Sequence, residues 1–232
     1  MIIIVSGTGT DIGKTIAVAA LASFYQSRAL EVVVAKPVQT GEEAGKGDIF
    51  TVSALVDVET AEYVRYPDPL APNLAARRAG QSQLTQEEVI EWIRALDGPR
   101  RVVLVEGAGG LLVRLADSFT LADVAVKLQA PLVVVTSLGL GSLNWAELTV
   151  REAQRRGISV AGLIGGCRPQ VFDLATQLNI EELENVTGVR LWGCIPEGVG
   201  KLNKVAFAQM ARHWLRSLPE DPGALDLLAR EP

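Results

Sequence analysis

The fold is decided near the start of the chain, where residues 2–15 read IIIVSGTGTDIGKT. Four apolar residues predict a buried strand, the glycines predict a tight turn, and a helix is expected from Lys14 onward. Backbone N–H groups of such a turn surround phosphates, while Lys14 reaches the β- and γ-phosphates and the Thr15 hydroxyl binds Mg²⁺. The spacing departs from the common G-x-x-x-x-G-K-[ST] pattern, because Thr8 stands in the place of its first glycine and Gly7 lies one residue earlier. The position between strand and helix predicts a phosphate-binding loop.

Short β-branched runs recur along the rest of the chain. They are apolar at every residue, which is typical of strands in a parallel sheet covered on both faces. Helices are expected between them, over residues 14–27, over residues 89–96 after a cap at Thr85, and over residues 142–156 before Gly157. This order predicts an α/β fold of the P-loop NTPase-like, doubly wound kind, with a mainly parallel sheet and helices on both faces. The expected strands are residues 2–5, 32–35, 102–105, 132–136 and 160–164.

The length and composition favour one domain. A chain of 232 residues with 48% hydrophobic residues can bury a sizeable core, and we find no repeat or linker, so residues 1–232 are predicted to form a single P-loop α/β domain. One long irregular connection is expected from about Gly41 to Pro72. Connections of this length are commonly functional, although its prolines could equally be plain loop residues.

Charge and cysteine content restrict the partners. With 22 Lys and Arg against 27 Asp and Glu, the net charge of −5 has the wrong sign for a protein that binds nucleic acid. Cys167, Cys194 and the single His213 are too few for a disulfide framework or a zinc site. The start of the chain lacks the pattern of a signal peptide, and no apolar run reaches the ~18 residues of a membrane span. We therefore expect a cytoplasmic protein with no membrane partner.

Two further motifs supply charged side chains at strand ends. Residues 35–41 read AKPVQTG, which places Lys36 at the end of the second expected strand, where open α/β sheets bind ligands. Residues 102–110 read VVLVEGAGG, and Glu106 is a candidate Mg²⁺ ligand because this ion takes one or two carboxylates together with phosphate oxygens. Asp48 is a candidate third ligand, although an aspartate beside glycines is more often a cap or turn residue.

Taken together, these motifs resemble those of the dethiobiotin synthetase family. The resemblance spans most of the chain, and its motifs lie at residues 7–15, 36–41, 105–110 and 140–144. It implies an ATP-dependent ligase that carboxylates a diamine, 7,8-diaminopelargonate, with CO₂ and closes the ureido ring. It also implies a carbamate that attacks the γ-phosphorus of ATP, followed by attack of the second amine on the resulting mixed anhydride.

The resemblance implies a role for each matching residue. Lys36 is expected to be catalytic together with Lys14, and Thr15, Asp48 and Glu106 are expected to bind Mg²⁺. The expected substrate contacts are Thr10, Lys36 and Thr40, with Gly141 and Asn144 binding the substrate carboxylate across a homodimer interface. The residues expected to bind ATP, or another nucleoside triphosphate, are Asp11, Ile12, Gly13, Lys14, Thr15, Ile16, Glu106, Gly107, Ala108, Gly109, Pro196, Glu197 and Gly198.

The sequence departs from the family at two places. Where many relatives have an asparagine that reads the adenine edge, this chain has Gly165, Gly166 and Cys167. Two glycines offer no side-chain polar group, so we expect loose selection of the nucleobase. A basic residue that some relatives carry before the Leu-Gly pair is Gly139 here.

Other functions share the expected fold. A switch ATPase of the partitioning or septum-positioning kind usually carries an additional lysine early in the phosphate-binding loop, and residues 6–12 contain none. An amidoligase related to cobyrinate synthesis would need a glutaminase with a cysteine nucleophile and a histidine. His213 falls in a helical stretch and is expected to be a surface or packing residue, so both alternatives are less favoured.

Overall fold

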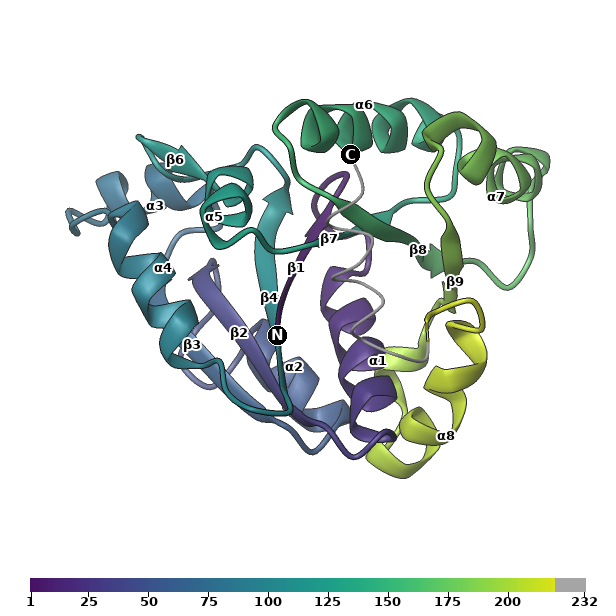
Figure 1. Cartoon of the computed structure of the whole chain (residues 1–232), viewed down its shortest axis with the longest axis horizontal. Coiled ribbons are helices and arrows are strands. Elements are labelled where there is room, and N and C mark those ends of the chain that lie inside the picture. The colour runs from purple at the N-terminus through teal and green to yellow at the C-terminus, as the bar shows by residue number, and fades with distance from the viewer. Residues whose placement is uncertain (220–232) are drawn as a thin grey trace.

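The computed structural model describes residues 1–219, which build a seven-stranded sheet with helices packed on it (Figure 1). The strand order is β3-β2-β4-β1-β7-β8-β9, and every neighbouring pair in it is parallel. The predicted α/β class is confirmed. The strands of this sheet are β1 (Ile2–Gly7), β2 (Glu31–Thr40), β3 (Glu59–Tyr66), β4 (Arg101–Gly110), β7 (Leu132–Thr136), β8 (Val160–Arg168) and β9 (Leu191–Pro196).

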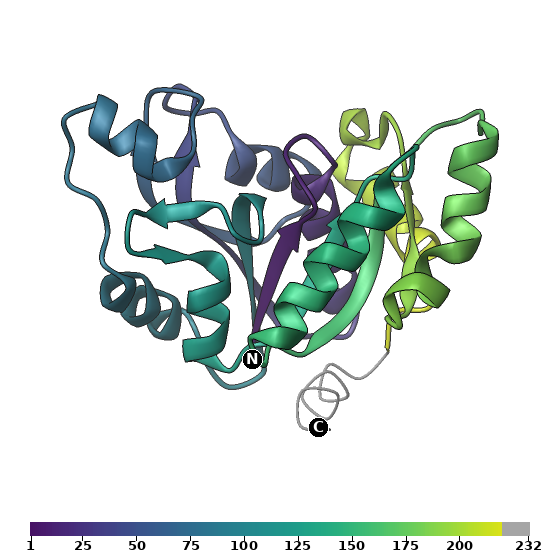
Figure 2. The ribbon, with the colours of Figure 1, turned by 90° about the horizontal axis from the view of Figure 1, so that it is seen from above.

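Helices cover both faces of the sheet (Figure 2). One face carries α1 (Lys14–Gln26), α2 (Asp48–Leu55) and α8 (Lys204–Trp214). The other face carries α3 (Pro72–Arg78), α4 (Gln86–Ala95), α5 (Leu121–Leu128), α6 (Ser142–Arg155) and α7 (Leu174–Thr187). A short 3₁₀ helix (Val199–Lys201) and a hairpin of β5 (Arg114–Ala116) and β6 (Phe119–Thr120) complete the secondary structure of the described residues.

The sheet separates two apolar cores. In β1, Ile3 and Val5 point into the core beneath α1, and Ile4 points into the core beneath the other helices. All three side chains are fully buried, and complete burial of such a side chain contributes about 1.5–3 kcal/mol. Burial on both faces explains why these strands are apolar at every residue instead of alternating.

The predicted elements are present, but the predicted connection is not irregular. Each expected strand exists, and α4 begins with a capping box formed by Thr85 and Glu88. The expectation of an irregular segment from Gly41 to Pro72 is wrong, because α2 and β3 lie within it. As an edge strand, β3 has β2 as its one neighbour in the described sheet and keeps polar, partly exposed residues, so its sequence lacks the apolar signature of the central strands.

A second difference concerns β2. The expected strand ended at Ala35, whereas β2 continues to Thr40 and contains Pro37. Lys36 therefore lies inside a strand and not at its end. The pairing of β2 with β4 stops at Ala35 and Val105, while its pairing with β3 continues to Thr40. Thus β2 and β4 separate at Lys36 and Glu106, the residues that follow the last paired positions.

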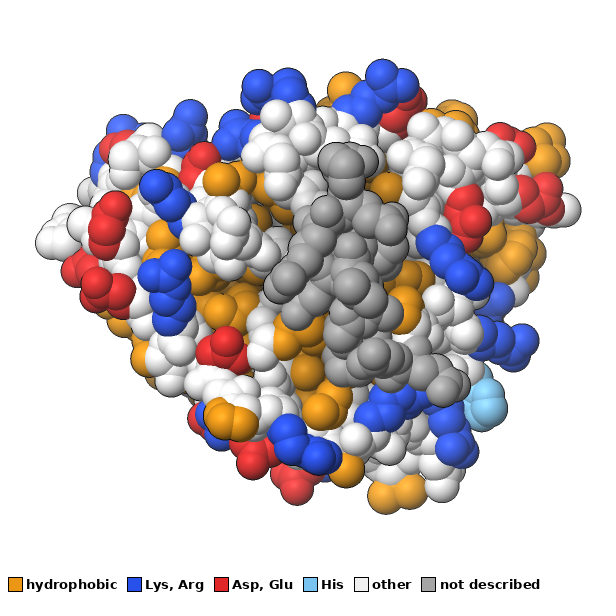
Figure 3. Space-filling view, viewed as in Figure 1, with side chains coloured by type: hydrophobic (Ala, Val, Ile, Leu, Met, Phe, Trp, Pro, Cys, Tyr) orange, Lys and Arg blue, Asp and Glu red, His pale blue; other side chains and the backbone are white. Residues whose placement is uncertain are grey.

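On the face seen in Figure 3, basic and acidic side chains are interspersed. His213 is exposed on α8, and Cys167 and Cys194 are free thiols. Within residues 1–219, no helix has both the length and the apolar character required to cross a membrane.

The phosphate-binding loop packs against β8 through glycine. A Cβ atom at Gly166 would lie 1.6 Å from the Ile12 carbonyl oxygen and 3.0 Å from a Val135 methyl group. Real Cβ contacts are never this short, so the loop approaches β8 closely only because residue 166 has no side chain.

The substitution Gly166→Ala is therefore expected to destabilise the protein by about 1–3 kcal/mol, the usual cost of inserting a methyl group into a packed site. Urea unfolding measures the difference. Gly98→Ala is the matched control, because the nearest atoms to a Cβ there lie at 3.9 Å. Equal stability of the two variants would contradict the packing of the loop on β8.

Candidate active site

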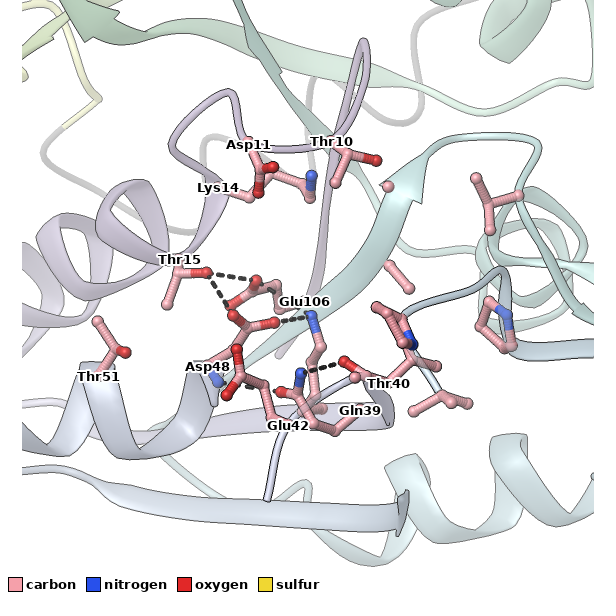
Figure 4. Close-up of a pocket in the computed structure, with 18 of the residues that line it drawn as sticks. Thr10, Asp11, Lys14, Thr15, Gln39, Thr40, Glu42, Asp48, Thr51 and Glu106 are labelled. Atoms are coloured by element: carbon pink, nitrogen blue, oxygen red, sulfur yellow. Dashed lines mark hydrogen bonds and ion pairs between the residues drawn. The ribbon is translucent and has the colours of Figure 1, made fainter. Parts of the chain in front are cut away.

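A cleft of about 940 Å³ lies at the carboxyl ends of β1, β2 and β4 (Figure 4). Open α/β sheets bind ligands at this edge. One side of the cleft is the phosphate-binding loop, and the other is the segment after β3. The lining residues are Thr10, Asp11, Gly13–Ile16, Lys36, Val38–Glu42, Asp48, Thr51, Pro69–Pro72, Glu106, Ala108, Gly109, Val113 and Cys167.

The start of α1 leaves backbone donors for an anion. Gly13 precedes the helix with a φ of 94° and has no side chain with which to cap it, so the first N–H groups of α1 remain available. The Lys14 side chain curls back over the loop, and its Nζ donates to the Gly9 carbonyl at 2.7 Å. Burial lowers the pKa of Lys14, and the nearby Lys36 lowers it further, whereas Glu106 opposes the shift. A site with two lysines and free N–H groups is suited to a polyphosphate.

Three oxygen-bearing side chains meet beside the loop. The Thr15 hydroxyl lies 3.0 Å from Asp48 Oδ1 and 2.9 Å from Glu106 Oε1. Thr15 is on the first turn of α1, Asp48 is the first residue of α2, and Glu106 lies on β4. Two carboxylates and one hydroxyl from three elements form a set of hard oxygen donors of the kind that Mg²⁺ prefers.

A further observation supports a divalent cation at these donors. Glu106 is 1% exposed, and its Oε2 is a buried atom without a hydrogen-bond partner among residues 1–219. A buried carboxylate oxygen left without a donor is costly, and a cation would satisfy it. In the same residues, no group of three or more His, Cys, Asp or Glu side chains could hold a metal, so phosphate oxygens and water would complete the coordination.

Lys36 joins the two carboxylates. Its Nζ forms ion pairs with Asp48 and Glu106, the latter at 3.2 Å, and donates to the Gly107 carbonyl at 3.0 Å. The residue is 3% exposed and fills the space that opens where β2 and β4 separate. Lys36 therefore carries a fixed positive charge beside the phosphate-binding loop, without the mobility of a surface lysine.

The electrostatics of this group follow from burial. Burial raises the pKa of Glu106 to about 7, against the attraction of Lys36. Burial alone would lower the pKa of Lys36, but the two carboxylates outweigh it, and the pKa is raised. Desolvation would raise the pKa of Asp48, but the interactions of its carboxylate, chiefly with Lys36, outweigh this effect and the pKa is lowered. Lys36 and Asp48 are thus held in their charged forms at neutral pH.

The opposite wall of the cleft is apolar, and sequence reasoning left its role open. Gly41 follows β2 with a φ of 76°, and a Cβ there would lie 2.6 Å from Pro69 Cβ. The chain after β3 is thereby packed over the end of β2, where Pro69–Pro72 and Val113 line the cleft. The proline-rich composition of this segment was the available signal.

Comparisons with known proteins show the family to which the chain belongs. A family model described as an AAA domain matches residues 2–200. The ATP-dependent dethiobiotin synthetase BioD of Corynebacterium diphtheriae is 59% identical over 90% of this chain and 94% of its own. The enzyme of Corynebacterium efficiens is 57% identical over 92% of this chain and 97% of its own. The enzyme of Rhodococcus jostii is 47% identical over 93% of this chain and 95% of its own. This chain belongs to the dethiobiotin synthetase family.

More distant similarity concerns the fold alone. The septum site-determining protein MinD of Pyrococcus horikoshii, solved with Mg-ADP, superposes with a TM-score of 0.57 at 17% identity, covering 99% of this chain and 95% of that one. A ParA family ATPase from Chlorobium tepidum has a TM-score of 0.51 at 15% identity, covering 99% of each chain. Both confirm the P-loop NTPase fold of this dethiobiotin synthetase family member.

The structure gathers most of the residues predicted from the family resemblance. Thr10, Asp11, Gly13–Ile16, Lys36, Thr40, Asp48, Glu106, Ala108 and Gly109 all line the cleft. Ile12 packs against the apolar core, and Gly107 contributes its carbonyl to Lys36. In the part of the chain that the structure describes, Gly141, Asn144 and Pro196–Gly198 lie outside the lining of this cleft.

The segment expected to adjoin the nucleobase is constrained by packing. A Cβ at Gly165 would lie 2.6 Å from Cys194 Sγ, and Gly166 is pressed against Ile12. Neither position has room for a side chain such as asparagine. Cys167 lines the cleft, and the Glu197 N–H donates to the Arg168 carbonyl at 2.8 Å, so the turn after β9 adjoins this segment. Loose base selection stays a prediction.

Proposed function

We propose that this chain carboxylates 7,8-diaminopelargonate with CO₂ and closes the ureido ring of dethiobiotin, converting ATP to ADP and phosphate. The observation that carries the proposal is the cluster of buried Lys36 and Glu106 with partly buried Asp48 and Thr15 beside the phosphate-binding loop, in a chain of this family. We further propose that the whole chain acts as one domain in the cytoplasm. The single domain is supported by the sheet, whose strands lie between residues 2 and 196. The cytoplasmic location is supported by the free thiols of Cys167 and Cys194.

The reaction proposed here passes through anions, and the cleft supplies positive charge. One substrate amine adds to CO₂ and loses a proton, giving a carbamate whose oxygen attacks the γ-phosphorus while ADP leaves. The second amine then attacks the carbonyl carbon and loses a proton, and phosphate leaves. Lys14 and the N–H groups at the start of α1 would hold the triphosphate, and Lys36 would stabilise charge on the transferring oxygens. Thr15, Asp48 and Glu106 would hold Mg²⁺, which supplies charge neutralisation of the phosphates when bound.

The alternative of a switch ATPase predicts a different response to substrate. We expect the purified protein to release phosphate from Mg-ATP only when bicarbonate and diaminopelargonate are both present, because no acceptor exists without the carbamate. A phosphate-release assay with each component omitted in turn measures this. Full ATP hydrolysis without the diamine would contradict the ligase and favour the switch.

Lys36→Gln is expected to reduce turnover by about 10²–10³, the typical loss when one preorganised donor is removed. Nucleotide binding should change little, because Lys36 lies on β2 and not in the phosphate-binding loop, whereas Lys14→Ala should weaken both. Steady-state kinetics and calorimetric nucleotide binding separate the two effects. Lys46→Gln is the matched control, since its side chain is exposed on the neighbouring loop. Near wild-type turnover in Lys36→Gln would show that Lys36 has no catalytic role.

We propose in addition that the active unit is a homodimer. Gly141, with a φ of 90°, precedes α6 and offers no side chain to cap it; the Ser142 N–H donates to the Gly139 carbonyl at 3.1 Å, and a helix start without a side-chain cap suits a carboxylate. Around this turn Leu140 is 94% exposed and Trp145 is 57% exposed. Leu174 and Leu178 are exposed on α7, which packs beside α6. An exposed apolar surface of this kind on two adjacent helices supports burial against a second copy.

Mixing two inactive variants tests the composite site. A dimer of Lys36→Gln with Asn144→Asp contains one intact site if the partner's turn contributes to it, so random exchange should restore about one quarter of the activity. The control mixture of Lys36→Gln with Lys14→Ala should restore none, because both changes affect the same half of the site. Absence of rescue, with exchange verified by mass spectrometry, would place the whole site in one chain.

A further inference from the structure

We propose that Gln39 is a positioning residue that fixes the Asp48 carboxylate for the divalent cation. This inference rests on the proposed function, because it assumes that Asp48 is a metal ligand. Gln39 lies on β2, is 6% exposed and lines the cleft (Figure 4). The family resemblance assigned it no role, and nothing in the proposed chemistry requires it to touch a reacting atom.

The amide of Gln39 binds the start of α2. Its Oε1 accepts a hydrogen bond from the Asp48 backbone N–H at 3.0 Å. Its Nε2 donates to the Thr40 carbonyl at 3.2 Å, which fixes the orientation of the amide plane. Both polar atoms of this buried side chain are therefore used, and one of them holds the residue whose carboxylate enters the site.

The start of α2 needs the hydrogen bond to Gln39 because the residue before the helix is a glycine. Helix starts are usually capped by a Ser, Thr, Asp or Asn side chain, but α2 begins after Gly47, which has none. Gln39 supplies the missing acceptor from a different element. A Cβ at residue 47 would lie 2.7 Å from Gln39 Oε1, so glycine is also what lets the amide approach.

The position of Asp48 depends on this bond more than on the preceding chain. Residues 42–46 are exposed, and Arg65 holds only the start of this loop, by hydrogen bonds to the Glu42 and Glu43 carbonyls at 3.0 and 2.9 Å. The carboxylate must nevertheless lie 3.0 Å from the Thr15 hydroxyl and beside Lys36. Groups that orient a metal ligand typically change metal affinity by about 10–100-fold when removed. Loss of the Gln39 amide should therefore weaken the metal site, beyond any loss of stability.

The test is binding of Mn²⁺, as a paramagnetic substitute for Mg²⁺, to the full chain with ADP, followed by electron paramagnetic resonance. Gln39→Met keeps the approximate side-chain volume and removes the acceptor, and Gln39→Asn keeps the amide but shortens it by one methylene group. Both should bind Mn²⁺ about 10–100-fold more weakly than the wild type. In steady-state assays the Mg²⁺ concentration for half-maximal rate should rise by a similar factor, while kcat at saturating Mg²⁺ changes less.

Gln83→Met is the matched control. Its Oε1 also accepts an aspartate backbone N–H, that of Asp117 at 2.7 Å, and it does not line the cleft. This variant should keep wild-type Mn²⁺ affinity even if its thermal stability falls. A purely structural role for Gln39 predicts lower stability with unchanged affinity for Mn²⁺.

Asp48→Asn tests the metal-binding role of Asp48 separately from the positioning role of Gln39. If it weakens Mn²⁺ binding and both Gln39 variants bind normally, the positioning role is overturned and the metal assignment stands. If Asp48→Asn itself binds Mn²⁺ as tightly as the wild type, the metal assignment and the positioning role both fail. Should Gln39→Met not fold, Gln39→Asn decides the outcome alone.

Discussion

A lysine buried between two carboxylates is the interaction on which the cleft depends. Lys36 is enclosed where β2 and β4 separate, and its ammonium group binds Asp48, Glu106 and the Gly107 carbonyl. Burying such charges is costly, and pairing them often only compensates for the desolvation. The group is therefore poorly explained as a device for stability. The two apolar cores on either side of the sheet supply the stability that allows a charged cluster to exist there.

Close packing imposes a second constraint, on the nucleotide side. The phosphate-binding loop rests on β8 at Gly166, and Cys194 fills the space that a side chain at Gly165 would need. The strand beside the expected nucleobase is thus limited to backbone groups and to Cys167. The two glycines are crowded by different neighbours, Gly165 by Cys194 and Leu138 and Gly166 by the Ile12 carbonyl of the loop.

Sequence reasoning succeeded where a residue's environment leaves a strong local pattern. Central strands are apolar throughout because helices cover both faces of the sheet. The phosphate-binding loop is recognisable because its residues are consecutive in the sequence. It failed for β3 and α2, since an edge strand stays polar and α2 is only eight residues long with a glycine at its start. It ended β2 too early because Lys36 and Pro37 look like the end of a strand. Gln39 left no signal at all, because its role arises from a contact with a helix start nine residues away.

Function in this fold depends on side chains outside the phosphate-binding loop. The fold is shared with MinD of Pyrococcus horikoshii, at a TM-score of 0.57 and 17% identity, so the fold by itself specifies no particular reaction. To this cleft β2, α2 and β4 contribute one buried lysine and two carboxylates that pair with it. The apolar wall of Pro69–Pro72 then gives the cleft a side that suits an aliphatic chain, opposite a side that suits phosphates. A substrate that combines an aliphatic chain with a group to be phosphorylated matches both walls, whereas a switch that only hydrolyses ATP has no use for the second.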